Sequence, residues 1–355
     1  MELIFVMMIT GRKFTFFLSV LVICSISEIA VAQSVDNLHE TSFKGIDAAD
    51  LRIRDPFILA DENSETYFLY RQIANGRGDS VQGIRGVEVY QSKNLKIWKG
   101  PQIVFRQPDN FWANAQVWAP EVHIFKGKYY LFVTFSANRS LNSDGAPWLP
   151  VRGTQILVSD SPLGPFKAFD NKAHTPHDWS SLDGTMWVED NVPWMIFCHE
   201  WTQIGDGAIE LLQLKPDLSA TEGMPQLLFH ASQAPWSKNL KDLGFDSNGL
   251  VTDGPFLYRT KIGKLLMIWS SFGSSDYAVG IAESESGKVT GPWKQQSELL
   301  FKADGGHAMI FTTFQGQLML CLHQPNKRQT ERMKLFKLED YWIAEKMVLK
   351  WDHLD

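Results

Sequence analysis

The stretch Trp118-Ala119-Pro120-Glu121-Val122-His123, with Gly127-Lys128-Tyr129-Tyr130-Leu131-Phe132 just after it, contains the design that decides the fold. A polar residue opens a short apolar strand, a tight turn follows, and an aromatic-rich strand returns. The same design occurs five times in the chain. The opening residues are Asp55, Glu121, Asp183, Asp253 and His307, and the returning strands are Thr66–Tyr70, Tyr129–Phe135, Pro193–Cys198, Leu265–Ser270 and Leu318–His323.

The opening residues lie 66, 62, 70 and 54 positions apart. Repeats of this length with several strands each are typical of β-propellers. We therefore predict an all-β, five-bladed β-propeller, formed by a single catalytic domain over residues 33–355. A radial arrangement of strands brings all five opening residues to one end of one axis. Four carboxylates and a histidine then share a pocket, which indicates a reaction site.

The composition is that of an ordinary globular protein, with 44% hydrophobic and 21% charged residues among 355. The net charge of −6 and the absence of a long basic run argue against nucleic acid as a partner. Cys198 and Cys321 both lie within apolar strands. We expect them to be buried as small hydrophobic residues rather than joined in a disulfide.

The N-terminus predicts an export signal over residues 1–32. Basic residues precede the apolar stretch Phe14–Cys24, and Ala30-Val31-Ala32 offers a small-residue cleavage site. Bacterial lipoprotein signals usually carry a small residue before the modified cysteine, whereas Ile23 precedes Cys24 here. Lipid anchoring is therefore not expected. The apolar stretch is too short to span a bilayer in the mature protein. We expect a periplasmic or secreted protein with no stable membrane span.

An Asp before Gly or Pro usually serves its own turn, where its side chain caps backbone N–H groups. The recurrence of acidic residues at one place in successive repeats indicates more than turn formation. Like charges that gather around an axis cost free energy, and functional sites are where proteins retain such costs. Clustering also raises the pKa of some of the carboxyl groups, which general-acid chemistry at neutral pH requires.

Several motifs in this order resemble glycoside hydrolase family 43, whose members are five-bladed propellers that cleave arabinose- and xylose-containing glycans. The resemblance runs from about Leu51 to Leu338, nearly the whole mature chain. The motifs are Arg54-Asp55-Pro56-Phe57, Trp118-Ala119-Pro120-Glu121-Val122, Gly127-Lys128-Tyr129-Tyr130-Leu131-Phe132, Leu182-Asp183-Gly184, Asp253-Gly254-Pro255, Trp269-Ser270-Ser271 and Gly306-His307.

The resemblance implies an inverting hydrolase that requires no cofactor. Asp55 matches the general base that activates water, and Asp183 matches the carboxylate that orients the acid and adjusts its pKa. Inversion places the base and the acid roughly 6.5–9.5 Å apart, because a water molecule must fit beside the sugar. His307 resembles a histidine that lies beside a structural calcium ion in many relatives. A satisfied core histidine is the equal alternative for His307.

The general acid is where the chain departs from the family pattern. The family usually has Glu before Gly-Pro in the fourth repeat, and this chain has Asp253 there. A side chain one methylene shorter holds its proton farther from the leaving oxygen. Glu200 offers another route, because the returning strand ends near the level of Asp183. We favour Glu200 as the acid, with Asp253 as the positional equivalent and a rim contact as the alternative for Glu200.

Six further residues are candidates for substrate binding. Glu121 is expected to bind sugar hydroxyls or to pair with an arginine, Arg54 or Arg71. The aromatic candidates serve either the pocket wall or the core. The six are Glu121, Trp118, Phe57, His199, Trp201 and Arg71. The segments Asn138–Val151 and Asp170–Ser181, rich in Pro, Asn, Asp and Trp, are expected to form loops that wall the pocket.

Together these features predict an exported glycosidase that releases terminal α-L-arabinofuranosyl or β-D-xylosyl units from plant-type polysaccharides or their oligosaccharides. A non-hydrolytic carbohydrate-binding propeller is one alternative, suggested by the missing Glu of the fourth repeat. A glycosidase of related fold that acts on galactan or fructan is another, since the fold alone does not fix the sugar.

Overall fold

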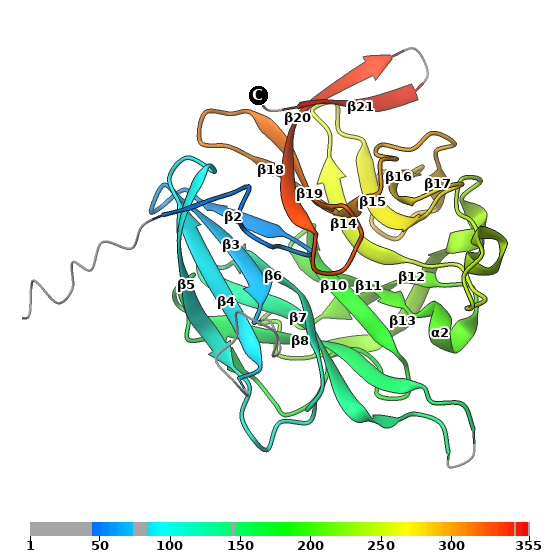
Figure 1. Ribbon diagram of the computed structural model, residues 1–355, viewed down its shortest axis with the longest axis horizontal. Helices are drawn as coiled ribbons and strands as arrows, with labels where there is room; N and C mark the ends of the chain where they lie inside the picture. Colours follow the sequence, from blue (N-terminus) through cyan, green and yellow to red (C-terminus); the bar gives the residue numbers. More distant parts are fainter. Residues whose placement is uncertain (1–44, 74–83, 144–145, 344–345, 354–355) are drawn as a thin grey trace, which may run out of the picture. The chain divides into compact units, whose positions relative to one another are not determined.

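The computed structural model describes residues 45–73, 84–143, 146–343 and 346–353. From Ile46 onward the chain forms one compact unit of five antiparallel sheets, which follow one another along the chain from blue to red in Figure 1. The predicted export signal lies outside the described residues. Within the described ranges, no helix is long and apolar enough to cross a membrane.

Each sheet is one blade, and consecutive strands pair as antiparallel neighbours. Blade one contains β2 (Phe57–Asp61), β3 (Thr66–Gln72), β4 (Gly86–Ser92) and β5 (Ile97–Arg106), with β1 (Ile46–Asp47) outside β5. Blade two contains β6 (Val117–Phe125), β7 (Lys128–Ser140), β8 (Pro150–Ser159) and β9 (Lys167–Ala168). Blade three contains β10 (Ser181–Glu189), β11 (Val192–His199), β12 (Ala208–Leu214) and β13 (Thr221–His230).

Blade four contains β14 (Asp253–Arg259), β15 (Leu265–Phe272), β16 (Tyr277–Ser284) and β17 (Trp293–Gln295). Blade five contains β18 (Gly306–Thr312), β19 (Leu318–Gln324), β20 (Arg332–Ile343) and β21 (Lys346–His353). The described helical segments are short: α2 (Trp201–Ile204), η1 (Ala231–Gln233) and η2 (Leu240–Leu243). The first strand of each blade is the inner one, and the inner strands contact one another in the cyclic order β2, β6, β10, β14, β18 and back to β2. The five-bladed β-propeller is therefore confirmed.

The chain closes the ring between blades five and one through a few polar contacts beside a shared core. Arg52 forms an isolated bridge with Arg332, and Arg54 donates a 2.8 Å hydrogen bond to the Asn326 side chain. Residues of blades one, two and five also share one apolar cluster, which includes Cys321. The C-terminal tail supplies the two outer strands of blade five. Cys198 and Cys321 are buried and free, as the sequence predicted.

A left-handed backbone residue occurs at the start of every inner strand. The five are Asp55 (φ 50°), Ala119 (φ 43°), Asp183 (φ 56°), Gly254 (φ 48°) and His307 (φ 50°). In blades two to five, the pairing register shifts at this residue and the one after it, as in a β-bulge. L-residues avoid this conformation at a cost of roughly 1–2 kcal/mol each. Its repetition therefore marks the structurally equivalent position of the five blades.

The bulge corrects the alignment of the opening residues. Asp55, Asp183 and His307 occupy the equivalent position, as predicted. Glu121 lies two residues after it, and Asp253 lies one residue before it. Because a shift along a strand changes the face and depth at which a side chain emerges, Glu121 and Asp253 do not repeat the placement of the other three.

The bulges are held from the neighbouring blade in a cyclic pattern. Asp183 N–H donates to Thr134 Oγ1 of blade two (2.8 Å), and His307 N–H donates to Ser270 Oγ of blade four (2.8 Å). Asp55 N–H donates to His323 Nδ1 of blade five (3.3 Å), which continues the pattern across the closure. Each of these acceptors lies on the returning strand of the preceding blade, opposite the residue just before the bulge of that blade.

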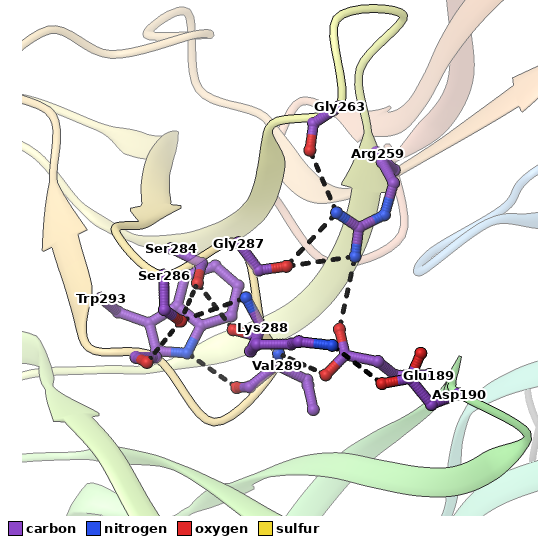
Figure 2. Close-up of polar contacts among 11 residues, drawn as sticks. Glu189, Asp190, Arg259, Gly263, Ser284, Ser286, Gly287, Lys288, Val289 and Trp293 are labelled. Atoms are coloured by element: carbon purple, nitrogen blue, oxygen red, sulfur yellow. Dashed lines mark hydrogen bonds and ion pairs between the residues drawn. The ribbon is translucent and has the colours of Figure 1, made fainter.

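The opposite ends of β10 and β14 are joined by ion pairs (Figure 2). Arg259 lies 3.3 Å from Glu189, and Lys288 lies 2.8 Å from Asp190. Glu189 also accepts a hydrogen bond from Val289 N–H (3.2 Å). We call these five residues the clasp. The clasp connects the turn after β10 in blade three to the turn between β16 and β17 in blade four.

Candidate active site

The inner strands begin at a cavity of about 810 Å³. Its lining comes from all five blades and includes eight residues predicted from the sequence as part of the site: Asp55, Asp183, Glu200, Asp253, Trp118, Trp201, Arg71 and His307. A cavity of this volume lies in the upper part of the range for small-molecule sites, so it has room for more than one sugar ring.

Asp55 is surrounded by positively charged and imidazole groups. Its Oδ1 lies 3.3 Å from Nδ1 of His307, 3.3 Å from Nδ1 of His323 and 3.8 Å from Nε of Arg54. Burial alone raises the pKa of a carboxyl group, but the two imidazoles and the guanidinium outweigh burial here. The pKa of Asp55 therefore lies well below its usual value, and the side chain stays ionised.

Asp183 has the opposite electrostatic character. Burial raises its pKa to about 7, the charge of His307 opposes the rise, and the charges of Asp253 and Asp55 add to it. Its Oδ2 accepts a 3.0 Å hydrogen bond from Gly254 N–H and lies 3.7 Å from His307 Nδ1. Asp183 thus binds the bulge of blade four, at the residue directly after Asp253. In blades one, three and five this bulge is bound by a polar residue on the returning strand of the preceding blade, but blade three has Cys198 at that position.

Asp253 lies between Asp183 and Tyr277. Tyr277 OH donates a 2.8 Å hydrogen bond to Asp253 Oδ2. Burial raises the pKa of Asp253, while the Tyr277 hydrogen bond and the charge of His307 oppose the rise. The Tyr277 ring can occupy this position because residue 306 is a glycine: a Cβ on Gly306 would lie only 2.3 Å from the ring. Asp253 is therefore a half-buried carboxyl group with a raised pKa, and the Tyr277 hydroxyl fixes its orientation.

Glu200 is bound differently from the three aspartates. Its Oε2 forms an ion pair with Arg152 and accepts a 2.7 Å hydrogen bond from Ser180 Oγ. Arg152 also lies over the Trp118 ring, 4.1 Å from its centroid. Glu200 and Arg152 are both buried, at 7% and 8% exposure. Glu200 is thus held against the cavity wall by a guanidinium and a hydroxyl, and a carboxyl group bound in this way is not free to turn towards a leaving oxygen.

His307 lies between the Asp55 and Asp183 carboxylates rather than beside an oxygen-rich cage. Burial lowers its pKa, but the charges of Asp55, Asp183, Glu121 and Asp253 raise it more, so the imidazolium form is favoured. Among the described residues, no three His, Cys, Asp or Glu side chains are arranged to hold a metal ion. Calcium prefers oxygen ligands, and the His307 ring is already paired with carboxylates. The described side chains around His307 therefore do not by themselves form a cage for an ion, and the calcium beside His307 stays a prediction.

Among the predicted substrate-binding residues, Trp118, Trp201 and Arg71 reach the cavity. Trp201 begins α2 and packs over Gly249, where a Cβ would lie 2.4 Å from the indole. Arg71 pairs with Glu88 (2.5 Å) and donates to the Arg52 carbonyl (2.9 Å), so its guanidinium is held in place.

Phe57, Glu121 and His199 are not among the residues that line the cavity. Phe57 belongs to the core, with its ring against His123. Glu121 is paired with His123 (3.0 Å) rather than with either arginine, as its position beyond the bulge dictates. His199 stacks on Trp179 at 4.0 Å and contacts Gln203.

The two predicted loops do not wall the cavity either. No described residue of 138–151 or 170–181 lines it, and both ends of the first segment belong to β7 and β8. The wall comes instead from the segments around Leu240–Phe245 and Asn326–Glu331. Ser180 nevertheless matters to the site, because it binds Glu200.

Three residues that the sequence analysis did not single out support the carboxylates: His323, Tyr277 and Arg152. His323 lies on its returning strand opposite the residue before the bulge, as Thr134 and Ser270 do, so a recurring polar residue at that position was the available signal. Tyr277 begins the apolar strand β16, and Arg152 lies within the apolar strand β8. Nothing else in the sequence indicates that either residue contacts a carboxylate.

A five-bladed propeller with carboxylates of contrasting pKa in its axial cavity has the architecture of a glycosidase. The family model of glycosyl hydrolases family 43 matches residues 47–350, and the chain belongs to that family. It resembles the crystal structure of an endo-arabinase from Bacteroides thetaiotaomicron VPI-5482, with 42% identity and a TM-score of 0.72, over 84% of this chain and 98% of that one.

Two curated relatives are more distant. An extracellular exo-α-(1→5)-L-arabinofuranosidase of Cellvibrio japonicus is 22% identical over 291 residues, which is 73% of this chain and 79% of that protein. An extracellular endo-α-(1→5)-L-arabinanase of Bacillus subtilis is 24% identical over 185 residues, or 50% of this chain and 52% of that protein.

Proposed function

We propose that the protein hydrolyses α-L-arabinofuranosyl linkages in arabinan-type glycans with inversion at the anomeric carbon. The observation that carries the proposal is the convergence of Asp55, Asp183 and Asp253 on one cavity with pKa values displaced in opposite directions. When the pKa values of similar carboxyl groups are separated in this way, one group can act as the base and another as the acid. A pure binding propeller gains nothing from clustered anions.

Asp55 is the proposed general base. Its lowered pKa keeps it ionised, and His307, His323 and Arg54 all lie against its Oδ1 atom, which leaves Oδ2 for the water molecule. An ionised and fixed carboxylate can accept a proton from a water molecule as that water attacks the anomeric carbon.

Asp253 is the proposed general acid, in preference to Glu200. The raised pKa of Asp253 supports a protonated carboxyl group that can donate to the leaving oxygen. Tyr277 and the backbone held by Asp183 position it, and the Tyr277 hydroxyl stabilises the carboxylate left after proton transfer. Glu200, paired with Arg152, serves instead to fix the cavity wall through Trp118.

The choice of sugar rests on the relatives. The 42% identical structure is described as an endo-arabinase, and both curated relatives act on α-(1→5)-linked arabinose. Arabinofuranosyl linkages are therefore preferred over xylosyl linkages. One curated relative cleaves at chain ends and the other within the chain, so the predicted release of terminal units is tested through the products formed.

We also propose export. The curated relatives are described as extracellular, and the N-terminal sequence has the features of a signal peptide. Comparison of the N-terminus and molecular mass of the protein from cells and from the exported fraction tests this. Retention of the first 32 residues in the exported protein contradicts the predicted cleavage.

The substrate assay uses linear arabinan, arabino-oligosaccharides, nitrophenyl arabinofuranoside, nitrophenyl xyloside, galactan and fructan, with Asp55→Asn as the inactive control. We expect arabinose or arabino-oligosaccharides only from the arabinose-containing substrates. Proton NMR of the first product should show the anomer opposite to that of the substrate. Binding without product on every substrate overturns the hydrolase, and a retained anomer overturns inversion.

The acid assignment has its own test. Asp253→Asn should spare cleavage of a nitrophenyl arabinofuranoside, whose leaving group needs little protonation, and should abolish cleavage of arabinan. Glu200→Gln should lower the activity on both substrates by similar factors. The reverse pattern, with leaving-group dependence only in Glu200→Gln, would make Glu200 the acid.

A further inference from the structure

Arginines form the wall of the cavity on blades one and five. Four line it: Arg52, Arg54, Arg71 and Arg328. Leu51 and Ile53 are 3% and 0% exposed in the core. Because side chains alternate along an extended segment, Arg52 and Arg54 emerge on the opposite face, which is the cavity.

Two of these arginines are already neutralised by carboxylates. Arg71 pairs with Glu88, and Arg54 pairs with Asp55. The charge of buried Glu331 is also directed at Arg54, since it helps to raise the pKa of that guanidinium.

Arg52 and Arg328 remain. Within the described part of the chain, neither side chain has a hydrogen bond or an ion pair. Asp55, Asp183 and Glu200 are paired with His307 and Arg152 instead. Buried Glu331 also lines the cavity, but among the described residues it forms no ion pair with either arginine. The cavity therefore holds two uncommitted positive charges on one wall.

Uncommitted guanidinium groups beside a catalytic centre indicate an anionic part of the ligand. The planar fork of arginine matches a carboxylate in two parallel hydrogen bonds. A neutral arabinan chain can accept hydrogen bonds through its hydroxyl groups, but it carries no negative charge to pair with the two guanidinium groups. We propose that the Arg52–Arg328 wall is a subsite for the carboxylate of a hexuronic acid residue on the glycan, next to the arabinosyl linkage that is cleaved.

This inference rests on the proposed function, because it places the uronate relative to the arabinosyl linkage. The experiment compares two substrates of equal size: an arabino-oligosaccharide that carries a hexuronic acid residue, and the methyl ester of the same compound. The ester keeps the shape and removes the charge. We expect kcat/KM to be about tenfold higher for the acid, since hydrogen bonds to charged groups contribute on that scale. The preference should shrink as salt is added.

The variants are Arg52→Gln, Arg328→Gln and the double substitution, with Lys327→Gln as the matched control. Lys327 is an exposed cation next to Arg328 that does not line the cavity. The acid-to-ester ratio should fall towards one in the arginine variants and stay unchanged in Lys327→Gln. Arg328→Lys, which keeps the charge without the fork, should recover only part of the ratio.

Equal kcat/KM values for acid and ester in the unaltered protein would overturn the subsite, as would a ratio that the double substitution leaves intact. A protein that cleaves neither compound fails the proposed function rather than this inference. In that event, calorimetric titration with the two oligosaccharides tests the subsite directly. Tighter binding of the acid than of the ester, lost in the double variant, supports it, and equal affinity overturns it.

Discussion

The two ends of β10 and β14 contrast in how they arrange charge. At the cavity end, these strands bring together the carboxyl groups of buried Asp183 and half-buried Asp253. At the other end, they bring together Glu189 and Arg259, which form an ion pair within the clasp (Figure 2). The same pair of strands thus places like charges at one end and opposite charges at the other.

The contrast separates the requirements of chemistry from those of stability. Like carboxyl groups in a low-dielectric cavity raise one another's pKa, which helps proton transfer but disfavours the folded state at neutral pH. The clasp joins opposite charges near solvent, where the gain per pair is small. Substitutions at the cavity end should therefore change activity most, and substitutions in the clasp should change stability slightly.

The largest effect is expected from Asp55→Asn. The amide keeps the size of the side chain but cannot accept the proton of the attacking water. Steady-state assays on arabinan should show kcat lowered by about 10²- to 10⁴-fold. Because Asp55 has a lowered pKa, its contribution to stability is present above pH 4 and is lost as the pH falls. Unfolding at pH 7 should therefore show the variant to be no more stable than the unaltered protein.

Asp183→Asn should show the opposite pH signature. The pKa of Asp183 is about 7 in the folded protein, so its stabilising contribution is complete below pH 4 and is lost as the pH rises through 7. The asparagine can still accept the Gly254 N–H and carries no charge. Denaturant unfolding should show the variant gaining relative stability between pH 4 and 8, by up to about 4 kcal/mol. A stability difference that does not vary with pH would contradict the raised pKa.

Glu200→Gln should destabilise the fold by about 3 kcal/mol, because it leaves the buried Arg152 guanidinium without its counter-charge. The matched control is Glu210→Gln. Glu210 is also buried, at 5% exposure, and burial raises its pKa to about 7 without a neighbouring charge as a cause. Denaturant unfolding at pH 8 should show the control to be neutral or stabilising. Similar losses in both variants would contradict the importance of the ion pair.

The smallest effect is expected in the clasp. Lys288 is 53% exposed and Asp190 is 78% exposed, so Lys288→Ala should lower the unfolding free energy by at most about 1 kcal/mol. Catalysis should not change, since the clasp lies at the opposite end of the inner strands from the cavity. A marked loss of kcat in this variant would show that the two ends of β10 and β14 are coupled.

The fold could be predicted from sequence because the blades repeat a local pattern of turns and apolar strands. Asp55, Asp183 and His307 could be placed for the same reason. The exact register of Glu121 and Asp253 could not, because it depends on bulges that shift the pairing by a residue or two. Contacts between blades were also out of reach, since Asp55 and His323 lie 268 positions apart. The sequence favours Glu200 as the acid because it does not reveal the ion pair with Arg152, which comes from a neighbouring blade.

The hydrogen bond from Asp55 to His323 also has a consequence for how the protein matures. The proposed base belongs to the first blade to leave the ribosome, and its support belongs to the last. A nascent chain that stops short of β19 carries Asp55, Asp183 and Asp253 and still lacks the imidazole of His323 that contacts Asp55. Catalytic activity should therefore appear only after the last blade has been synthesised and folded. A partly synthesised chain should not hydrolyse glycans.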